Sequence, residues 1–127
     1  MCDNNRNRGF TLIELLVALA ILATILSIAV PRYFSNIETT QENVLKEDLY
    51  VMRDAIDHFY SDKGLYPNAL TDLVAQNYLR SLPVDPFTQS ANSWTVVAPT
   101  QTGIGAVYDV HSGAAGQGQD GTWLATW

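Results

Sequence analysis

The strongest pattern in the chain is a single apolar run near its N-terminus. Between Phe10 and Val30 the sequence has twenty-one residues and one charge, Glu14. At a rise of about 1.5 Å per residue, a helix of this length nearly spans a hydrocarbon core of about 30 Å. A cleaved secretory signal has a shorter apolar segment and a small-residue cleavage site, and the residues after Val30 do not form one. The run therefore predicts a membrane-spanning helix.

A second apolar pattern follows with the period of an α-helix. Its members recur in steps of four and three residues, at Leu45, Leu49, Met52, Ile56 and Phe59. Charged residues occupy the other side of this predicted helix: Glu42, Lys46, Glu47, Arg53, Asp54 and Asp57. We expect the apolar stripe to pack on a core and the charged side to be solvated. Pro31 separates the two patterns and is expected to weaken or kink the helix rather than end it.

The second half of the chain is predicted to form short elements joined by turns. Gly64 and Pro67 end the long helix, and a second helix is predicted from Ala69 to about Tyr78. The segment LPVDPF, residues 82–87, predicts a turn or extended loop. Segments 93–99 and 105–112 alternate and are rich in β-branched and aromatic residues, which predicts two strands. The expected fold class is α+β, with a long N-terminal helix whose amphipathic half packs on a small antiparallel sheet.

Composition and charge narrow the classes of function. The chain has 127 residues, of which 47% are hydrophobic, and a formal net charge of -6. These values fit one small domain plus one membrane span, and the acidic balance argues against nucleic acid as a partner. Arg6 and Arg8 precede the apolar run while most acids follow it, which predicts a cytoplasmic N-terminus. The single cysteine, Cys2, cannot form an intrachain disulfide.

Glu14 is unusual because it lies inside the predicted span. A carboxylate at membrane depth costs about 2.5 to 3.5 kcal/mol on insertion scales. The run itself contains no Lys or Arg that could pair with it. One interpretation is that the side chain, only one turn from the start of the run, reaches the membrane interface and has no function. The other is that Glu14 pairs with a group in a protein-lined site.

The residues around Glu14 resemble the N-terminal signal of type IV pilins and of the pseudopilins of type II secretion systems. The matching stretch is RGFTLIELLV, residues 8–17. The resemblance implies that a prepilin peptidase cuts between Gly9 and Phe10 and N-methylates Phe10. It also implies that Glu14 neutralises the Phe10 amine of a neighbouring subunit during assembly. The implied divisions are a leader of residues 1–9, a transmembrane and assembly helix of 10–31, and a periplasmic globular domain of 32–127.

Three internal segments make the chain most similar to the major pseudopilins of type II secretion. They are GLYP at 64–67, LPVDPF at 82–87 and YDVHSGAAG at 108–116. The resemblance implies a type IV pilin-like fold and a structural, non-enzymatic subunit. Such a subunit crosses the inner membrane once and places its globular domain in the periplasm. It polymerises into a helical homo-oligomer, the pseudopilus, with other pseudopilins and an inner-membrane assembly platform, to drive protein export across the outer membrane.

The same resemblance raises the question of a calcium ion. The family's major pseudopilins bind calcium in a C-terminal loop that contains an aspartate at a position where this chain has Ala115. Calcium takes about six to eight oxygen ligands. A site here would depend on Asp120, Ser112 and main-chain carbonyl groups, and the alternative is a loop that is ordered by packing of its aromatic residues. We expect no cofactor, with calcium as the alternative to be tested.

Two other functions remain open at the level of sequence. The signal also fits a pilin or minor pilin of a type IV pilus used for motility, adhesion or DNA uptake. A third function is that of a single-span protein whose acidic domain binds a partner without polymerising, which predicts an uncleaved N-terminus. Catalysis is not indicated, because Asp109, His111 and Ser112 are too close along one strand to form an acid, base and nucleophile relay.

Overall fold

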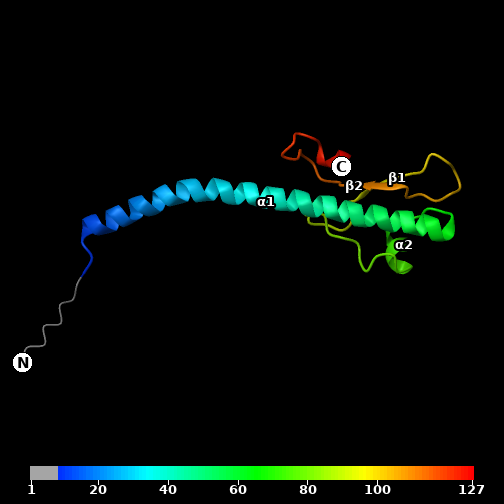
Figure 1. Ribbon diagram of the computed structural model, residues 1–127, viewed down its shortest axis with the longest axis horizontal. Coiled ribbons are helices and arrows are strands. Elements are labelled where there is room, and N and C mark those ends of the chain that lie inside the picture. Colours follow the sequence, from blue (N-terminus) through cyan, green and yellow to red (C-terminus); the bar gives the residue numbers. More distant parts are fainter. Residues whose placement is uncertain (1–8) are drawn as a thin grey trace, which may run out of the picture. The chain divides into compact units, whose positions relative to one another are not determined.

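The structure is a computed structural model that describes residues 9–127. Its helices and strands follow the predicted order (Figure 1): helix α1 (Leu12–Lys63), helix α2 (Leu70–Ala75), strand β1 (Thr95–Val97) and strand β2 (Asp109–His111). A short 3-10 helix that was not predicted, η1 (Leu124–Thr126), follows them. The two strands pair antiparallel, so the predicted α+β class is confirmed. Residues 1–8, which hold most of the predicted leader, lie outside the described residues. The chain divides into two compact units between Ile37 and Glu38.

The first unit contains the N-terminal part of α1. Its most apolar window has a mean hydropathy of 2.6 and is 0% buried, so α1 is long and apolar enough to act as a single membrane span. Two hydroxyl groups within the run are satisfied by the helix itself. Thr24 and Ser27 donate to the carbonyl groups of Ala20 and Ala23, each at 2.8 Å. Such internal pairing suits a segment that lies in hydrocarbon, where water cannot satisfy polar groups.

Helix α1 continues through Pro31 and ends where the sequence predicted. The prediction that the helix resumes after Pro31 is confirmed, because α1 extends without a break to Lys63. At that end Gly64 adopts a φ of 70°, and its N–H donates to the Tyr60 carbonyl at 2.8 Å. This left-handed conformation is the one that glycine takes at helix C-termini at little steric cost.

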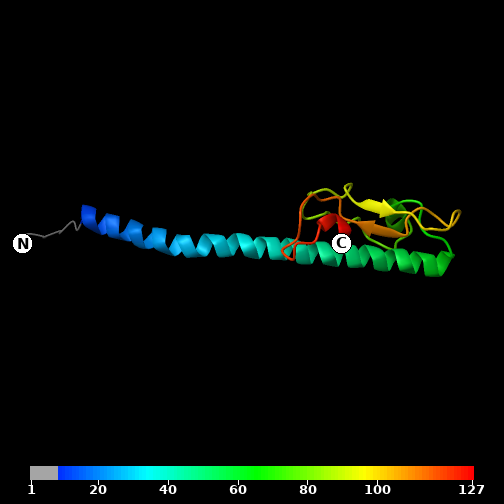
Figure 2. The same ribbon diagram turned by 90° about the horizontal axis from the view of Figure 1, so that it is seen from above.

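The core of the second unit lies against one face of the C-terminal half of α1. Every residue of the predicted apolar stripe is buried, with exposed fractions between 0% and 5%. The later segments complete the same cluster with Leu70, Leu73, Trp94, Val107, Val110, Ala114 and Leu124. Figure 2 shows the sheet and η1 on one side of this half of α1. Since each fully buried aliphatic side chain contributes about 1.5 to 3 kcal/mol, this face holds the sheet on the helix.

Helix α2 is shorter than the sequence predicted. It ends at Ala75 rather than near Tyr78. The physical reason is Asn77, which adopts a positive φ of 63°. Asparagine tolerates this conformation better than most residues, and it turns the chain so that the N–H groups of Tyr78 and Leu79 both donate to the Leu73 carbonyl. The prediction was too long because the apolar residues keep helical spacing on both sides of Asn77, so their pattern does not show that the helix ends before it.

The strands are also shorter than predicted, with three paired residues each. Their register joins Thr95 to His111, Val96 to Val110 and Val97 to Asp109. The residues before β2 bond elsewhere, since the N–H groups of Ala106 and Val107 donate to the Pro67 carbonyl at 3.1 and 2.9 Å. The GLYP turn that ends α1 thus takes hydrogen bonds that a longer strand would have used.

The segment LPVDPF forms the predicted turn, and its aspartate is buried. Asp85 is 0% exposed. Its Oδ1 atom accepts hydrogen bonds from the N–H groups of Phe87 and Thr88 at 2.8 and 3.3 Å. A buried carboxylate is tolerated when its oxygens are paired in this way.

Candidate functional site

The predicted cleavage position lies in accessible, non-helical chain. Gly9 and Phe10 are exposed and precede α1, with Phe10 86% exposed. No described atom lies within 4 Å of the place where a Cβ on Gly9 would stand. The helix begins directly afterwards, because the Thr11 hydroxyl accepts a hydrogen bond from the Glu14 N–H at 3.2 Å. The 9–10 peptide bond is therefore open to an enzyme, and nothing in the described part of the chain itself requires glycine there.

Glu14 lies in the exposed first turn of α1. A carboxylate at this position is favoured by the partial positive charge of the helix N-terminus. Within residues 9–127, its side chain has no hydrogen bond or ion pair to another residue. The apolar side chains that follow it along the helix are also exposed. Glu14 thus has no partner within the described residues, in agreement with the sequence, where the apolar run contains no Lys or Arg.

Ser112, one of the two side chains considered for calcium, is already committed within the core. It is 1% exposed. Its hydroxyl donates to Oδ2 of Asp85 and accepts from the Ala114 N–H at 3.1 Å. These bonds join the LPVDPF turn to the end of β2. Because the hydroxyl points to Asp85, it is not bonded to His111, and no base and nucleophile pair forms there.

Asp120, the other candidate ligand, is exposed and bonded within its own turn. Its Oδ1 atom accepts from the Thr122 hydroxyl at 2.6 Å and from the Thr122 N–H at 3.0 Å. These two hydrogen bonds are the main reason that the pKa of Asp120 lies below its usual value. Desolvation opposes them, and the charge of Lys46 adds a smaller lowering effect. The carboxylate is thus held in its charged form by neighbours in the protein.

The residues of the C-terminal loop do not fit a calcium ion well. The structure engages Ser112 and Asp120 with different partners, and Ala115 offers no side-chain oxygen. Among residues 9–127, no group of three or more His, Cys, Asp or Glu side chains could hold a metal ion. Calcium sites usually combine several carboxylate oxygens, whereas this loop contains one carboxylate.

Arg53 forms the main polar connection in the second unit, and the sequence had placed it on the solvated side of α1. This expectation was wrong. The guanidinium Nε donates to Oδ1 of Asp109 at 2.8 Å, and Nη2 donates to the Val110 carbonyl at 2.8 Å. Nη2 also donates to the main-chain oxygen of Trp127. One side chain of α1 therefore joins β2 to the last residue of the chain.

Two further residues from the same set also contact the C-terminal loop. The Glu42 carboxylate accepts from the Gln119 N–H at 2.6 Å. The Lys46 ammonium lies 4.7 Å from the centre of the Trp127 ring, a cation–π contact. Of the remaining members, Glu47, Asp54 and Asp57 are exposed, as predicted.

The spacing of these three residues along the sequence carries a signal for their contacts. Glu42, Lys46 and Arg53 follow one another in steps of four and seven, which places them on one narrow stripe of a helix. This stripe borders the buried face. Charged residues at such a border can lie beneath a loop, whereas those on the far side cannot. The pattern alone does not say which distant segment covers them.

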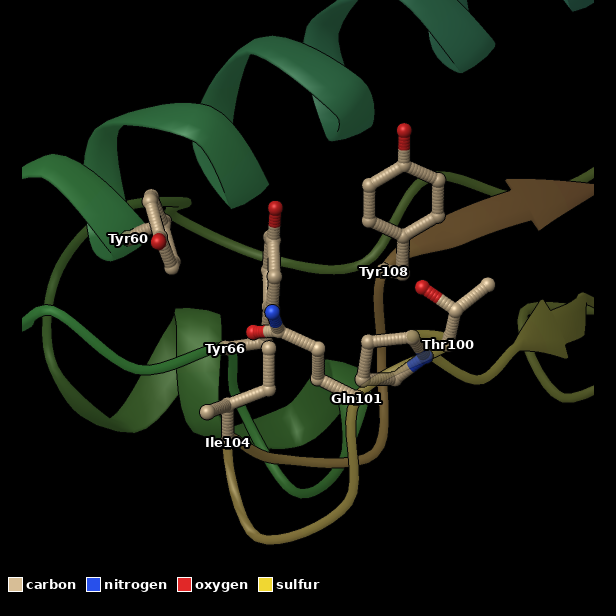
Figure 3. Close-up of a pocket in the computed structure, with 7 residues that line it drawn as sticks. Tyr60, Tyr66, Thr100, Gln101, Ile104 and Tyr108 are labelled. Carbon is tan, nitrogen blue, oxygen red and sulfur yellow. The ribbon is translucent and has the colours of Figure 1, made fainter.

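A small cavity lies at the other end of the second unit (Figure 3). It has a volume of about 270 Å³ and is lined by Tyr60, Tyr66, Pro99, Thr100, Gln101, Ile104 and Tyr108. The Tyr60 and Tyr66 rings stack with centres 4.4 Å apart, and Tyr66 meets Tyr108 nearly edge-on at 5.4 Å. The lining contains no acid or base that is charged near neutral pH, so the cavity offers packing rather than acid–base chemistry.

Comparison with known proteins agrees with the N-terminal motif. Residues 4–30 match the family described as the prokaryotic N-terminal methylation motif. The chain is 26% identical over 136 residues to the type II secretion system core protein G of Klebsiella pneumoniae, covering 93% of this chain and 95% of the relative. It is 28% identical over 138 residues to the protein of the same name from Escherichia coli (strain K12), covering 96% and 90%.

A shorter alignment matches a protein of the same name. The core protein G of Pectobacterium carotovorum subsp. carotovorum is 32% identical over 98 residues, which is 65% of this chain and 63% of the relative. No solved structure matches the chain. The predicted resemblance is confirmed: the chain has a prepilin-type methylation motif and is similar along nearly its whole length to core protein G.

Proposed function

We propose that this chain is the structural subunit of the periplasmic pseudopilus of a type II secretion system. In this function it is processed by prepilin peptidase and polymerises to drive protein export across the outer membrane. The observation that supports this most strongly is the similarity to core protein G along nearly the whole chain, together with the methylation motif at residues 4–30. The function is structural and does not include catalysis.

Processing takes place at the bond between Gly9 and Phe10. This proposal is supported by the exposure of both residues and by their position just before α1. It is also supported by the open space around Gly9. The described part of the chain has room for a larger side chain there, so recognition by the peptidase explains the glycine. Cleavage gives Phe10 a free α-amine, which remains cationic when the peptidase adds a methyl group.

Assembly depends on Glu14 and the Phe10 amine of the next subunit. In the described chain Glu14 has no partner, while the apolar side chains from Leu12 to Val30 are exposed and need lipid or neighbouring helices to cover them. An ion pair in such apolar surroundings is screened far less than in water, and an unpaired charge is strongly disfavoured. The pair therefore favours one axial register of the helices over other registers.

The proposed location is the bacterial inner membrane. The apolar part of α1 anchors the subunit with its N-terminus in the cytoplasm, and the second unit lies in the periplasm. Its partners are prepilin peptidase, further copies of itself in a helical filament, the other pseudopilins and the inner-membrane assembly platform.

The proposal is tested with Glu14→Ala in a strain that lacks the wild-type gene. We expect mass spectrometry of the membrane protein to find a cleaved chain that begins at methylated Phe10. Filament assembly and exoprotein secretion should both be lost. Glu47→Ala, an exposed glutamate elsewhere on α1, is the matched control and should leave both intact. Normal assembly of the Glu14→Ala protein would show that the pairing idea is wrong.

The same strains separate the alternatives. A pilin or minor pilin of a type IV pilus would leave exoprotein secretion normal in the deletion strain and abolish twitching or DNA uptake. A single-span protein that does not polymerise would retain residues 1–9, so a methylated Phe10 at the N-terminus excludes it.

A further inference from the structure

We propose that Glu42, Lys46 and Arg53 hold the C-terminal loop, residues 113–127, on α1 in place of a calcium ion. We call these three side chains the α1 clasp. The comparison with calcium rests on the proposed function, since it concerns the loop in which related major pseudopilins bind the ion. The contacts themselves are properties of this chain alone.

The α1 clasp binds the loop at separate points along its length. Glu42 accepts the Gln119 N–H at 2.6 Å, near the middle of the loop. Lys46 lies over the Trp127 ring, and Arg53 donates to the main-chain oxygen of the same residue. Hydrogen bonds in which one partner is ionised are about twice as strong as neutral ones, so this set can order a glycine-rich segment.

The loop continues these contacts with bonds of its own. The Trp127 ring N–H donates to the Thr122 hydroxyl at 2.6 Å, and that hydroxyl donates to Asp120 at 2.6 Å. Gln117 and Trp123 form an isolated antiparallel bridge, and Leu124 is only 2% exposed. Asp120 is thus connected through Thr122 to the residue that Lys46 and Arg53 hold.

Neighbouring groups already stabilise the negative charge of Asp120, as a bound cation would. The hydrogen bonds from Thr122 and, to a smaller extent, the charge of Lys46 favour the ionised form of Asp120, which is the effect that a bound metal ion would have. A divalent ion at the same carboxylate would be repelled by this ammonium group. The remaining side-chain oxygen considered for calcium belongs to Ser112, which is buried and bonded to Asp85.

The first experiment measures the response of the full-length chain, purified in detergent micelles, to calcium chloride and to EDTA. Hydrogen exchange of residues 113–127 and the thermal unfolding midpoint are followed in both. We expect the two solutions to give the same exchange rates and the same midpoint, and a calorimetric titration with calcium chloride to give no saturable heat. Slower loop exchange or a higher midpoint in calcium would overturn the proposal.

The second experiment removes the clasp charges one at a time. Arg53→Gln and Lys46→Gln should each accelerate exchange in the loop, by about tenfold for the arginine, which loses charge-assisted hydrogen bonds. Lys46 is exposed, so its variant is expected to fold even where Arg53→Gln does not. Arg80→Gln and Lys63→Gln, at exposed positions away from the loop, are the matched controls and should change nothing there.

Unchanged loop exchange in Lys46→Gln and in folded Arg53→Gln would contradict the clasp. These measurements use purified protein and need neither filament assembly nor secretion. A failure of the clasp would therefore leave the proposed function untouched, and a failure of secretion in the Glu14 strains would leave the clasp untouched.

Discussion

Arg53 and Asp109 form the ion pair that connects α1 to β2. The distance from Nε to Oδ1 is 2.8 Å, and the side chains are 36% and 31% exposed. Partial exposure allows solvent to screen the pair, so its own contribution is modest. The same guanidinium also bonds two main-chain oxygens, of Val110 and Trp127. Arg53 therefore matters more as a multiple hydrogen-bond donor than as one half of an ion pair.

This difference predicts unequal effects for two conservative variants. Arg53→Lys cannot reproduce the planar fork of donors and should lower the free energy of unfolding by about 1 to 2 kcal/mol. Asp109→Asn removes the charge and leaves the main-chain bonds of Arg53, so the expected loss is about 0.5 to 1 kcal/mol. Urea titration can measure both, followed by the fluorescence of the three tryptophans, which all lie in the second unit. If the two variants lost equal free energy of unfolding, the hydrogen bonds from Arg53 to main-chain oxygens would not be its larger contribution.

The apolar stripe of α1 predicts a graded series of losses. Leu49→Ala, at a position that is 2% exposed, should lower the free energy of unfolding by about 2 to 5 kcal/mol because it leaves a cavity. Ile56→Val removes one methylene group and should cost about 0.5 to 1.5 kcal/mol. Leu65→Ala is the control, since Leu65 is 49% exposed and should change stability by less than about 0.5 kcal/mol.

The features that the sequence predicted correctly are those encoded by nearby residues. The α1 stripe repeats every three or four positions, and Gly64 follows the helix end directly. The signal around Gly9 and Glu14 is likewise a continuous motif, which is why comparison with known proteins could confirm the resemblance over residues 4–30.

The features that were missed depend on residues far apart in the chain. Arg53 is 56 positions from Asp109 and 74 from Trp127, so its helical spacing could not reveal its partners. The second predicted strand, 105–112, was too long at its start because the N–H groups of Ala106 and Val107 donate to the Pro67 carbonyl instead of pairing with the other strand. Asp85 belongs to the predicted LPVDPF turn, but its carboxylate also accepts the hydroxyl of Ser112, which lies 27 positions away and which the local segment does not reveal.

Two glycines with positive φ separate steric crowding from backbone conformation. Gly105 has a φ of 111°, and a Cβ there would stand 2.2 Å from the Tyr66 carbonyl oxygen. Gly103 has a φ of 85°, and no described atom lies within 4 Å of its Cβ position. Alanine at Gly103 should cost about 1 kcal/mol from conformation alone. Alanine at Gly105 should cost clearly more, and the difference in urea midpoint between the two variants reports the clash with the GLYP turn.

Asp48 predicts a pH dependence of stability in the second unit. Burial, followed by the charges of Asp85 and Glu47, raises the pKa of Asp48 above its usual value. The folded chain therefore binds a proton more tightly at this site than the unfolded chain does. Stability from this site is greatest at low pH, where the group is protonated in both states, and falls as the pH rises from the unfolded pKa through the raised folded pKa.

Asp48→Asn removes this charge without changing the size of the side chain. We expect the variant to be more stable than the wild type near neutral pH. Its advantage should shrink as the pH is lowered through the raised pKa of Asp48, because the wild-type side chain then gains its proton. Urea midpoints measured across that range give the comparison. Asp57→Asn, at an exposed position on the same helix, should show no such pH-dependent gain. If Asp48→Asn were less stable at neutral pH, the carboxylate would be contributing a favourable contact that outweighs its burial and its repulsion by Asp85.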